Sequence, residues 1–185
     1  MVKLLLAGTG LIGHRHMQHI LEHPDLELVG VIDPLITDEK IEGVKTYHSL
    51  NDVNNVAEGI ILATPTETHA DLTIQSLEMG LHVLVEKPVA ASLPEADKMI
   101  RASEKTGLSI LVGHHRRHHP LVNETINIIK SGKIGRPVAA SLMWLMRKQD
   151  EYFDVEWRKG IDGGPIKQNL IHDVDTLRAF FGEII

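Results

Sequence analysis

Three glycines directly after a short apolar segment constrain the fold of this chain more than any other feature of the sequence. Residues 2–7 read VKLLLA, and the turn GTGLIG follows at residues 8–13. From residue 11 to residue 22 apolar side chains recur at helical spacing, and His23-Pro24-Asp25 ends the pattern. We therefore predict a buried strand, a tight turn and a helix that begins within that turn.

The alternation of strands and helices continues to about residue 112. Helical patterns lie at residues 67–79 and 92–107, and the second opens with the capping box Ser92-Leu93-Pro94-Glu95. Strands that are apolar throughout are typical of a parallel sheet covered on both faces, so we predict an α/β fold. The further strands are predicted at residues 26–32, 46–47, 59–63, 81–85 and 108–112.

The glycine spacing GxGxxG, with an acidic residue at the end of the next strand, predicts a dinucleotide site. The first glycine allows the tight turn, the second lets the backbone approach a pyrophosphate, and the third lets the helix pack on the strand. Asp33 follows Gly13 by 20 residues, the spacing of the residue that bonds the adenosine ribose. This combination favours a Rossmann domain, placed at residues 1–118, over other orders of parallel strands. The turn residues expected to contact the cofactor are Gly8, Thr9, Gly10, Leu11, Ile12 and Gly13.

Asp33 also bears on which dinucleotide binds. Its carboxylate would accept hydrogen bonds from the ribose hydroxyls and would repel a 2′-phosphate, so NAD is favoured over NADP. FAD-binding domains share the glycine pattern, but residues further along the chain favour a nicotinamide cofactor. A glycine turn that holds no ligand is the alternative.

Polar residues follow the strand predicted at residues 59–63. The carboxyl ends of parallel strands meet at the edge of the sheet where ligands bind. Thr64, Pro65 and His69 are therefore expected to contact the cofactor. Thr66 could bond it too, or could instead cap the next helix.

Glu86 and Lys87 end the strand predicted at residues 81–85, beside the expected nicotinamide ring. We expect both residues to contact the cofactor. A partly desolvated lysine next to an oxidised nicotinamide could exchange a proton near neutral pH, so Lys87 is a candidate acid or base. A surface salt bridge between Lys87 and Glu86 is the alternative.

The pattern changes after residue 118. A helix to about residue 130, one strand at residues 137–146 and a helix at residues 166–181 are predicted. A single strand cannot form a sheet that closes a core, so residues 119–185 are expected to be the incomplete start of an α+β domain. On the last helix Gln168, His172 and Asp175 share a face, and the Gly163-Gly164-Pro165 turn before it would let the helix begin close to a ligand.

Four of the 12 histidines lie within residues 114–119, which read HHRRHH. Their spacing permits a metal site on a helix, but the two arginines in the same run would repel a cation, and we predict no metal. Arg116, Arg117 and the imidazoles could instead contact an anion or a polyol, or form structure that links the domains.

Composition excludes several classes of function. Acidic residues outnumber basic ones by 25 to 19, which disfavours nucleic-acid binding. The absence of cysteine excludes disulfides, thiolate metal sites and a cysteine nucleophile. No apolar run approaches the ~18 residues of a membrane span. We therefore expect a cytoplasmic protein with no nucleic-acid or membrane partner.

Five segments in order, AGTGLIGHRH, ATPTETHA, VLVEKPVA, VGHHRRHHP and GGPIKQNLIHDVDTLR, resemble the glucose-fructose oxidoreductase/inositol dehydrogenase (Gfo/Idh/MocA) family over nearly the whole chain. The resemblance implies NAD(P)-dependent oxidation of a sugar or cyclitol hydroxyl, or the reverse reduction. It implies that Lys87 is the catalytic lysine and His172 the catalytic histidine. In proteins of this family the peptide bond that corresponds to Lys87-Pro88 is often cis. The residues expected to contact the substrate are Lys87, Arg116, Gln168 and His172.

The sequence departs from the family in two ways. Gln168 stands where the family commonly has an aspartate, and an amide can bond a substrate hydroxyl but cannot take up a proton. The chain also ends before most of the C-terminal sheet that walls the family's substrate pocket and forms its oligomer interface. We therefore expect a truncated chain that forms a homo-oligomer when full length. The alternatives are a dinucleotide-sensing protein without catalysis and an inactive fragment.

Overall fold

The structure, a computed structural model, describes residues 1–54, 57–154, 159, 164 and 166–184. Its contacts divide the chain into two compact units, residues 1–113 and residues 114–185. The assignment of residues 1–118 to cofactor binding and 119–185 to substrate binding and oligomerisation stays a prediction.

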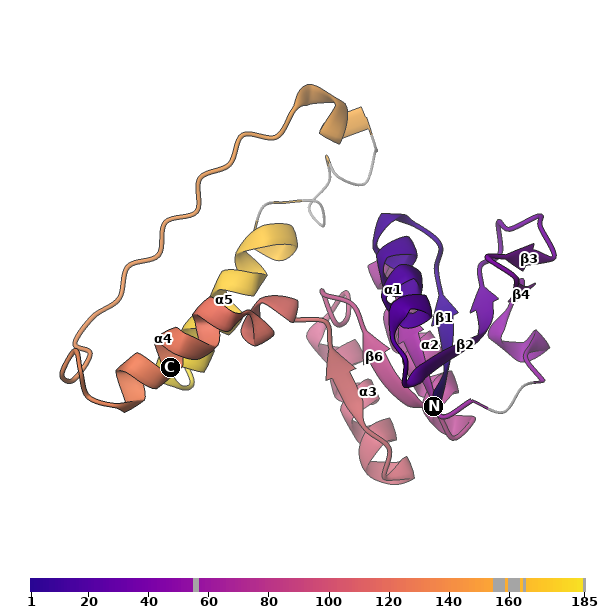
Figure 1. The fold of residues 1–185 in the computed structure, drawn as a ribbon, viewed down its shortest axis with the longest axis horizontal. Coiled ribbons are helices and arrows are strands. Elements are labelled where there is room, and N and C mark those ends of the chain that lie inside the picture. The colour runs from indigo at the N-terminus through magenta and orange to yellow at the C-terminus, as the bar shows by residue number, and fades with distance from the viewer. Residues whose placement is uncertain (55–56, 155–158, 160–163, 165, 185) are drawn as a thin grey trace. The chain divides into compact units, whose positions relative to one another are not determined.

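The first unit is built on one sheet, drawn from indigo to magenta in Figure 1. Among the described residues it has seven strands in the order β3-β4-β2-β1-β5-β6-β7, and every neighbouring pair is parallel except β3 and β4. Without β3 this is the 3-2-1-4-5-6 order of dinucleotide-binding folds, so the predicted α/β Rossmann fold is confirmed. The strands are β1 (Val2–Ala7), β2 (Leu26–Ile32), β3 (Lys40–Ile41), β4 (Val44–Tyr47), β5 (Gly59–Leu62), β6 (His82–Val85) and β7 (Ile110–Val112).

Helices α1 (Leu11–Glu22), α2 (His69–Glu78) and α3 (Leu93–Thr106) cover the two faces of this sheet. One apolar cluster joins α2 and α3 to the sheet and includes Leu5, and the other joins α1 to the sheet and includes Leu6. Successive side chains of a strand point to opposite faces, which is why neighbouring leucines of β1 enter different clusters. One half of the predicted capping box forms at α3, where Ser92 Oγ accepts a hydrogen bond from the Glu95 N–H, while the Glu95 carboxylate accepts one from the N–H of Ala91.

The second unit contains α4 (Pro120–Lys130) and α5 (Ile171–Phe181), which contact each other. A 3₁₀ turn at His115–His118 precedes α4, a 3₁₀ turn lies at Asp150–Asp154, and a π-helical turn at Ile166–Leu170 leads into α5. Gly163 and Pro165 of the predicted glycine turn lie outside the described residues. No described helix of the chain is long and apolar enough to cross a membrane.

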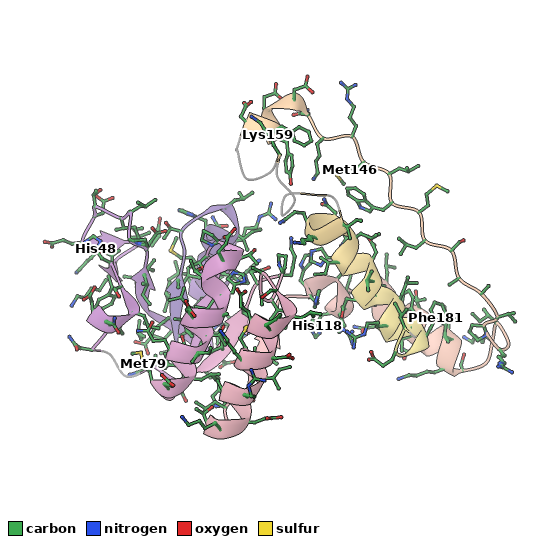
Figure 2. The ribbon with its side chains drawn as sticks, turned by 180° about the vertical axis from the view of Figure 1, so that it is seen from behind. His48, Met79, His118, Met146, Lys159 and Phe181 are labelled. Atoms are coloured by element: carbon green, nitrogen blue, oxygen red, sulfur yellow. The ribbon has the colours of Figure 1, made fainter. Side chains whose placement is uncertain are left out.

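The strand predicted at residues 137–146 is wrong for this structure. The backbone there is drawn out, but it forms no ladder with any strand that the structure describes. Apolar side chains on this segment stay exposed, Val138 at 95% and Leu145 at 84%, and Figure 2 labels Met146 on it. A strand needs a hydrogen-bonded neighbour, and apolar patterning alone does not supply one.

The turn between β1 and α1 is packed too tightly for side chains at two of its glycines. Gly8 has a φ of +92°, and a Cβ on it would lie 2.5 Å from the carbonyl oxygen of Ala63. A Cβ on Gly13 would lie 2.0 Å from the carbonyl oxygen of Gly8. At Gly10 an added Cβ would meet no atom of the described residues within 4 Å. The chain's own packing therefore requires glycine at two of the three positions.

We expect Gly13→Ala to destabilise the first unit by about 1–3 kcal/mol, because the new methyl group forces α1 away from the turn. Gly10→Ala is the matched control and should cost less than about 1 kcal/mol, the loss of a favourable N-cap residue. Urea unfolding followed by circular dichroism measures both. Equal losses for the two variants would contradict this account of the turn.

Candidate cofactor site and catalytic residues

The N-terminus of α1 faces the space that Gly10 leaves open. Gly10 is the N-cap of α1, and the first turn of the helix contains no acidic residue. The first N–H groups of a helix have no acceptor within the helix, and its dipole places partial positive charge there. Leu11 and Ile12 are 72% and 40% exposed at this end. The turn can therefore receive a pyrophosphate, and its residues fit the predicted dinucleotide.

Asp33 lies at the end of β2 and is held by the glycine turn itself. Its Oδ2 accepts hydrogen bonds from the Thr9 N–H at 2.9 Å and the Thr9 hydroxyl at 2.6 Å, and its Oδ1 accepts one from the Leu35 N–H at 3.0 Å. Partial burial acts to raise the pKa of Asp33, but these hydrogen bonds outweigh it and lower the pKa below its ordinary value. Asp33 is thus an oriented anion, and Oδ1 keeps a lone pair for a further donor.

Thr64, Pro65 and His69 lie after β5, where β1 and β5 form the point at which the strand order reverses. Thr68, which sequence reasoning did not single out, bonds this loop: its hydroxyl lies 2.7 Å from Thr64 Oγ1 and 2.8 Å from the Pro65 carbonyl. Thr66 begins the 3₁₀ turn Thr66–Thr68, and no side chain that the structure describes caps that turn. The cofactor contacts of Thr64 and Pro65 stay a prediction.

His69 is buried, with 1% of its surface exposed. Its Nδ1 lies 2.8 Å from the carbonyl oxygen of Pro88, and its Nε2 lies 2.9 Å from the carbonyl oxygen of Thr64. The ring therefore joins the loop after β5 to the turn after β6. The predicted contact between His69 and the cofactor stays a prediction.

Glu86 is bonded by a residue that the sequence reasoning missed, His16 of α1. The Nε2 of His16 lies 2.8 Å from Glu86 Oε1, and the Lys87 N–H donates to Glu86 Oε2 at 3.2 Å. A Cβ on Gly113 would lie 2.9 Å from this carboxylate, so glycine leaves room for it. Burial acts to raise the pKa of Glu86, but His16 and Lys87 outweigh it and the pKa is lowered. The sequence signal that could have identified His16 is the spacing Gly13-x-x-His16, because it places the imidazole one turn along the helix on the same face as Gly13.

Lys87 directly follows Glu86 at the carboxyl end of β6, and the Lys87-Pro88 peptide is cis, as the family resemblance implies. The positions at which strands end along this edge of the sheet thus carry the glycine turn, Asp33, Thr64 and Lys87. These residues belong to the first unit.

In the second unit the run at residues 114–119 bonds to α5. Arg116 donates to Asp173 at 2.8 Å, and Arg117 makes a two-pronged ion pair with Asp175, its shortest contact being 2.6 Å. Burial acts to raise the pKa of Asp175, but the Arg117 bonds outweigh it and the pKa is lowered. No group of three or more metal-ligating side chains occurs among the residues the structure describes.

His172 is buried on α5 with two imidazoles against it. Its ring lies 4.8 Å from that of His115 and 5.9 Å from that of His114, both in edge-on geometry. Gln168 lies in the π-helical turn before α5, where its N–H donates to the carbonyl of Gly164. The substrate contacts of His172, Gln168 and Arg116 stay predictions.

Comparison with known proteins adds an independent finding. The model of the Gfo/Idh/MocA oxidoreductase family, an NAD-binding Rossmann fold, matches residues 2–114. The chain is 31% identical over 192 residues to 4-carboxy-2-hydroxymuconate-6-semialdehyde dehydrogenase of Sphingobium sp., covering 100% of this chain and 60% of that protein. It is 27% identical to inositol 2-dehydrogenase of Rhizobium meliloti, covering 98% of this chain and 56% of the relative.

Among solved structures, the WlbA dehydrogenase from Bordetella pertussis, in complex with NADH and UDP-GlcNAcA, is similar with a TM-score of 0.85 and 27% identity. The match covers 98% of this chain and 55% of that one. The chain thus spans just over half the length of these three relatives.

Thr9→Val should raise the pKa of Asp33, because it removes the hydroxyl donor. A folded-state pKa below the unfolded value contributes stability above that value, and the contribution is lost as the pH falls through the folded pKa. We therefore expect Thr9→Val to cost about 1 kcal/mol at pH 7 and to lose less stability than the parent below about pH 4. A carboxyl-carbon NMR titration of Asp33 and urea unfolding at both pH values test this.

Thr125→Val serves as the control, since the Thr125 hydroxyl is exposed and bonds only the Leu121 carbonyl of its own helix among the contacts that the structure gives it. It should leave the titration of Asp33 unchanged. An unchanged Asp33 titration in Thr9→Val would overturn the assignment of Thr9 as the residue that holds this carboxylate.

Proposed function

Because this chain belongs to the Gfo/Idh/MocA oxidoreductase family, we propose that its protein is an NAD-dependent dehydrogenase of a sugar-like or cyclitol substrate. A bound NAD would supply the hydride acceptor for the substrate C–H, and a side chain of the protein would take the hydroxyl proton, so that oxidation would leave a carbonyl group. The names of the inositol and UDP-GlcNAcA relatives support this substrate class. The observation that carries the proposal is the open space at Gly10 beside the ionised Asp33.

The first unit would hold the cofactor. The N–H groups at the start of α1 would bond the pyrophosphate, and the missing side chain at Gly10 would let it come close. Asp33 would use its remaining lone pair on a ribose hydroxyl. Because the carboxylate is kept ionised, it would repel a 2′-phosphate, which favours NAD over NADP.

Lys87 would carry the proton transfer. Its place at the end of β6 puts it at the edge of the sheet where ligands bind in such folds, and Glu86 beside it is fixed by His16. When the hydroxyl is oxidised, Lys87 would take its proton, and in the reduction it would return the proton. The family resemblance supports His172, Gln168 and Arg116 as substrate contacts, with Gln168 bonding a hydroxyl through its amide.

A dinucleotide-binding regulatory protein without catalysis is the second candidate. Gln168 favours it, because an amide at this position cannot hold an imidazolium at His172 electrostatically. Both candidates would bind the dinucleotide at the same site, but only the first would oxidise a substrate hydroxyl. A measurement of turnover therefore separates the two.

Gly10→Ala should weaken NAD binding at least tenfold with little change in stability, because its methyl group would occupy the space that the pyrophosphate needs.

Asp33→Ser should reduce the ratio of NAD affinity to NADP affinity at least tenfold, since the charge that repels a 2′-phosphate is gone. Isothermal titration of both dinucleotides into this chain measures these effects. Unchanged affinities in both variants would contradict the proposed site.

Lys87→Met in the full-length protein should lower kcat at least 100-fold and change NAD affinity less than threefold, because it removes the proton acceptor and keeps most of the length of the side chain. Lys105→Met, an exposed position near the end of α3, is the matched control and should retain full activity. NADH formation with a panel of polyols and sugars is the assay. Turnover that survives Lys87→Met would contradict the catalytic role, and NAD binding without any turnover would favour the regulatory candidate.

A further inference from the structure

His69 presents an unusual pair of hydrogen-bond partners. It is the first residue of α2 and is 1% exposed, and both ring nitrogens face backbone carbonyl oxygens. Nδ1 lies 2.8 Å from the Pro88 oxygen and Nε2 lies 2.9 Å from the Thr64 oxygen. Both distances are those of good N–H···O hydrogen bonds.

A carbonyl oxygen can only accept a hydrogen bond. A neutral imidazole has one N–H and one bare nitrogen, so one of its two contacts would set a lone pair against a lone pair at less than 3 Å. The doubly protonated ring donates at both nitrogens. We infer that His69 is an imidazolium cation that holds the carbonyls of Thr64 and Pro88, and that it acts as the positioning residue for Lys87.

Some features around the His69 ring oppose a positive charge on it, and others favour one. Burial and the N-terminal position in α2 oppose a cation at His69. Two charge-assisted hydrogen bonds offset this, and Asp71 contributes a carboxylate in the same first turn of the helix. The turn that His69 bonds also carries the ionised Glu86 carboxylate. The cation is thus held by two carbonyl dipoles.

The positioning role rests on the proposed function. Pro88 directly follows Lys87, so a bond to its carbonyl fixes the backbone from which the Lys87 side chain extends. The second bond fixes that turn to the loop after β5. His16 bonds Glu86 on the other side of Lys87, so the lysine lies between two bonded residues. Since both nitrogens of His69 are engaged by backbone, its contribution to the reaction is to hold Lys87 in place.

The charge state is tested first, by nitrogen-15 NMR of the histidine rings in this chain at pH 7.5. Both ring nitrogens of His69 should show directly bonded, slowly exchanging protons, and these signals should vanish in His69→Gln. His48, which is exposed, serves as the comparison and should give no slowly exchanging pair. A single protonated nitrogen on His69 would overturn the inference. This measurement needs no turnover, so it stands apart from the proposed enzyme activity.

The positioning role is tested with His69→Gln in the full-length protein. Its amide can donate to one carbonyl but sets its own oxygen against the other. We expect kcat to fall at least tenfold while KM and NAD affinity change less than threefold, with the same split at 10 °C, where a merely less stable protein stays folded. His19→Gln, exposed on α1, is the control and should match the parent.

The outcomes separate the two proposals. An unchanged kcat in folded His69→Gln, alongside a Lys87→Met variant that is inactive, would remove the positioning role and leave the proposed function intact. If His69→Gln does not fold, the ring-proton signals of the parent still decide the charge state. If Lys87→Met is fully active, the proposed function fails together with the positioning role. The charge on His69 is decided separately, by the NMR signals of its ring protons.

Discussion

The close packing of α1 against the turn after β1 sets the position of most of the candidate cofactor site. The backbone of Gly13 lies so near the Gly8 carbonyl that a side chain cannot fit between them. This contact fixes where the helix begins and hence where its N–H groups point. It also brings Thr9 to Asp33, and it places His16, one turn further along, at Glu86. A change in the direction of α1 would therefore move the anion-binding turn, the ribose carboxylate and the neighbour of Lys87 together.

Along the edge of the sheet, histidines connect segments that strand pairing leaves unconnected. The ladder of β6 ends at Val85, and although the Glu86 N–H still donates to the Leu62 carbonyl of β5, the ladder does not include Lys87 and Pro88. His16 and His69 supply that connection from the helices on the two faces. A buried side chain with two donors suits this task, since loop carbonyls that leave the ladder still need hydrogen bonds.

The second unit is organised by charge and ring packing more than by a sheet. Two arginines bond two aspartates of α5, and three histidine rings meet at His172. The extended segment at residues 137–146 belongs to no sheet among the described residues. Its apolar pattern predicts a strand. A strand needs a hydrogen-bonded neighbour, however, and no strand among the described residues pairs with this segment.

The sequence by itself determined the Rossmann fold, the glycine turn, Asp33 and the place of Lys87. It could do so because these features depend on short-range patterns, and parallel strands bring their carboxyl ends to a common edge. Only the tertiary structure decided that Thr9 holds Asp33, that His16 bonds Glu86 and that His69 bonds two carbonyls. The partners of His16 and His69 lie up to 70 residues away in sequence, and no local pattern records which distant atoms a buried side chain will meet. The same reason explains why Arg116 and Arg117, read as possible ligand contacts, turned out to bond carboxylates of α5.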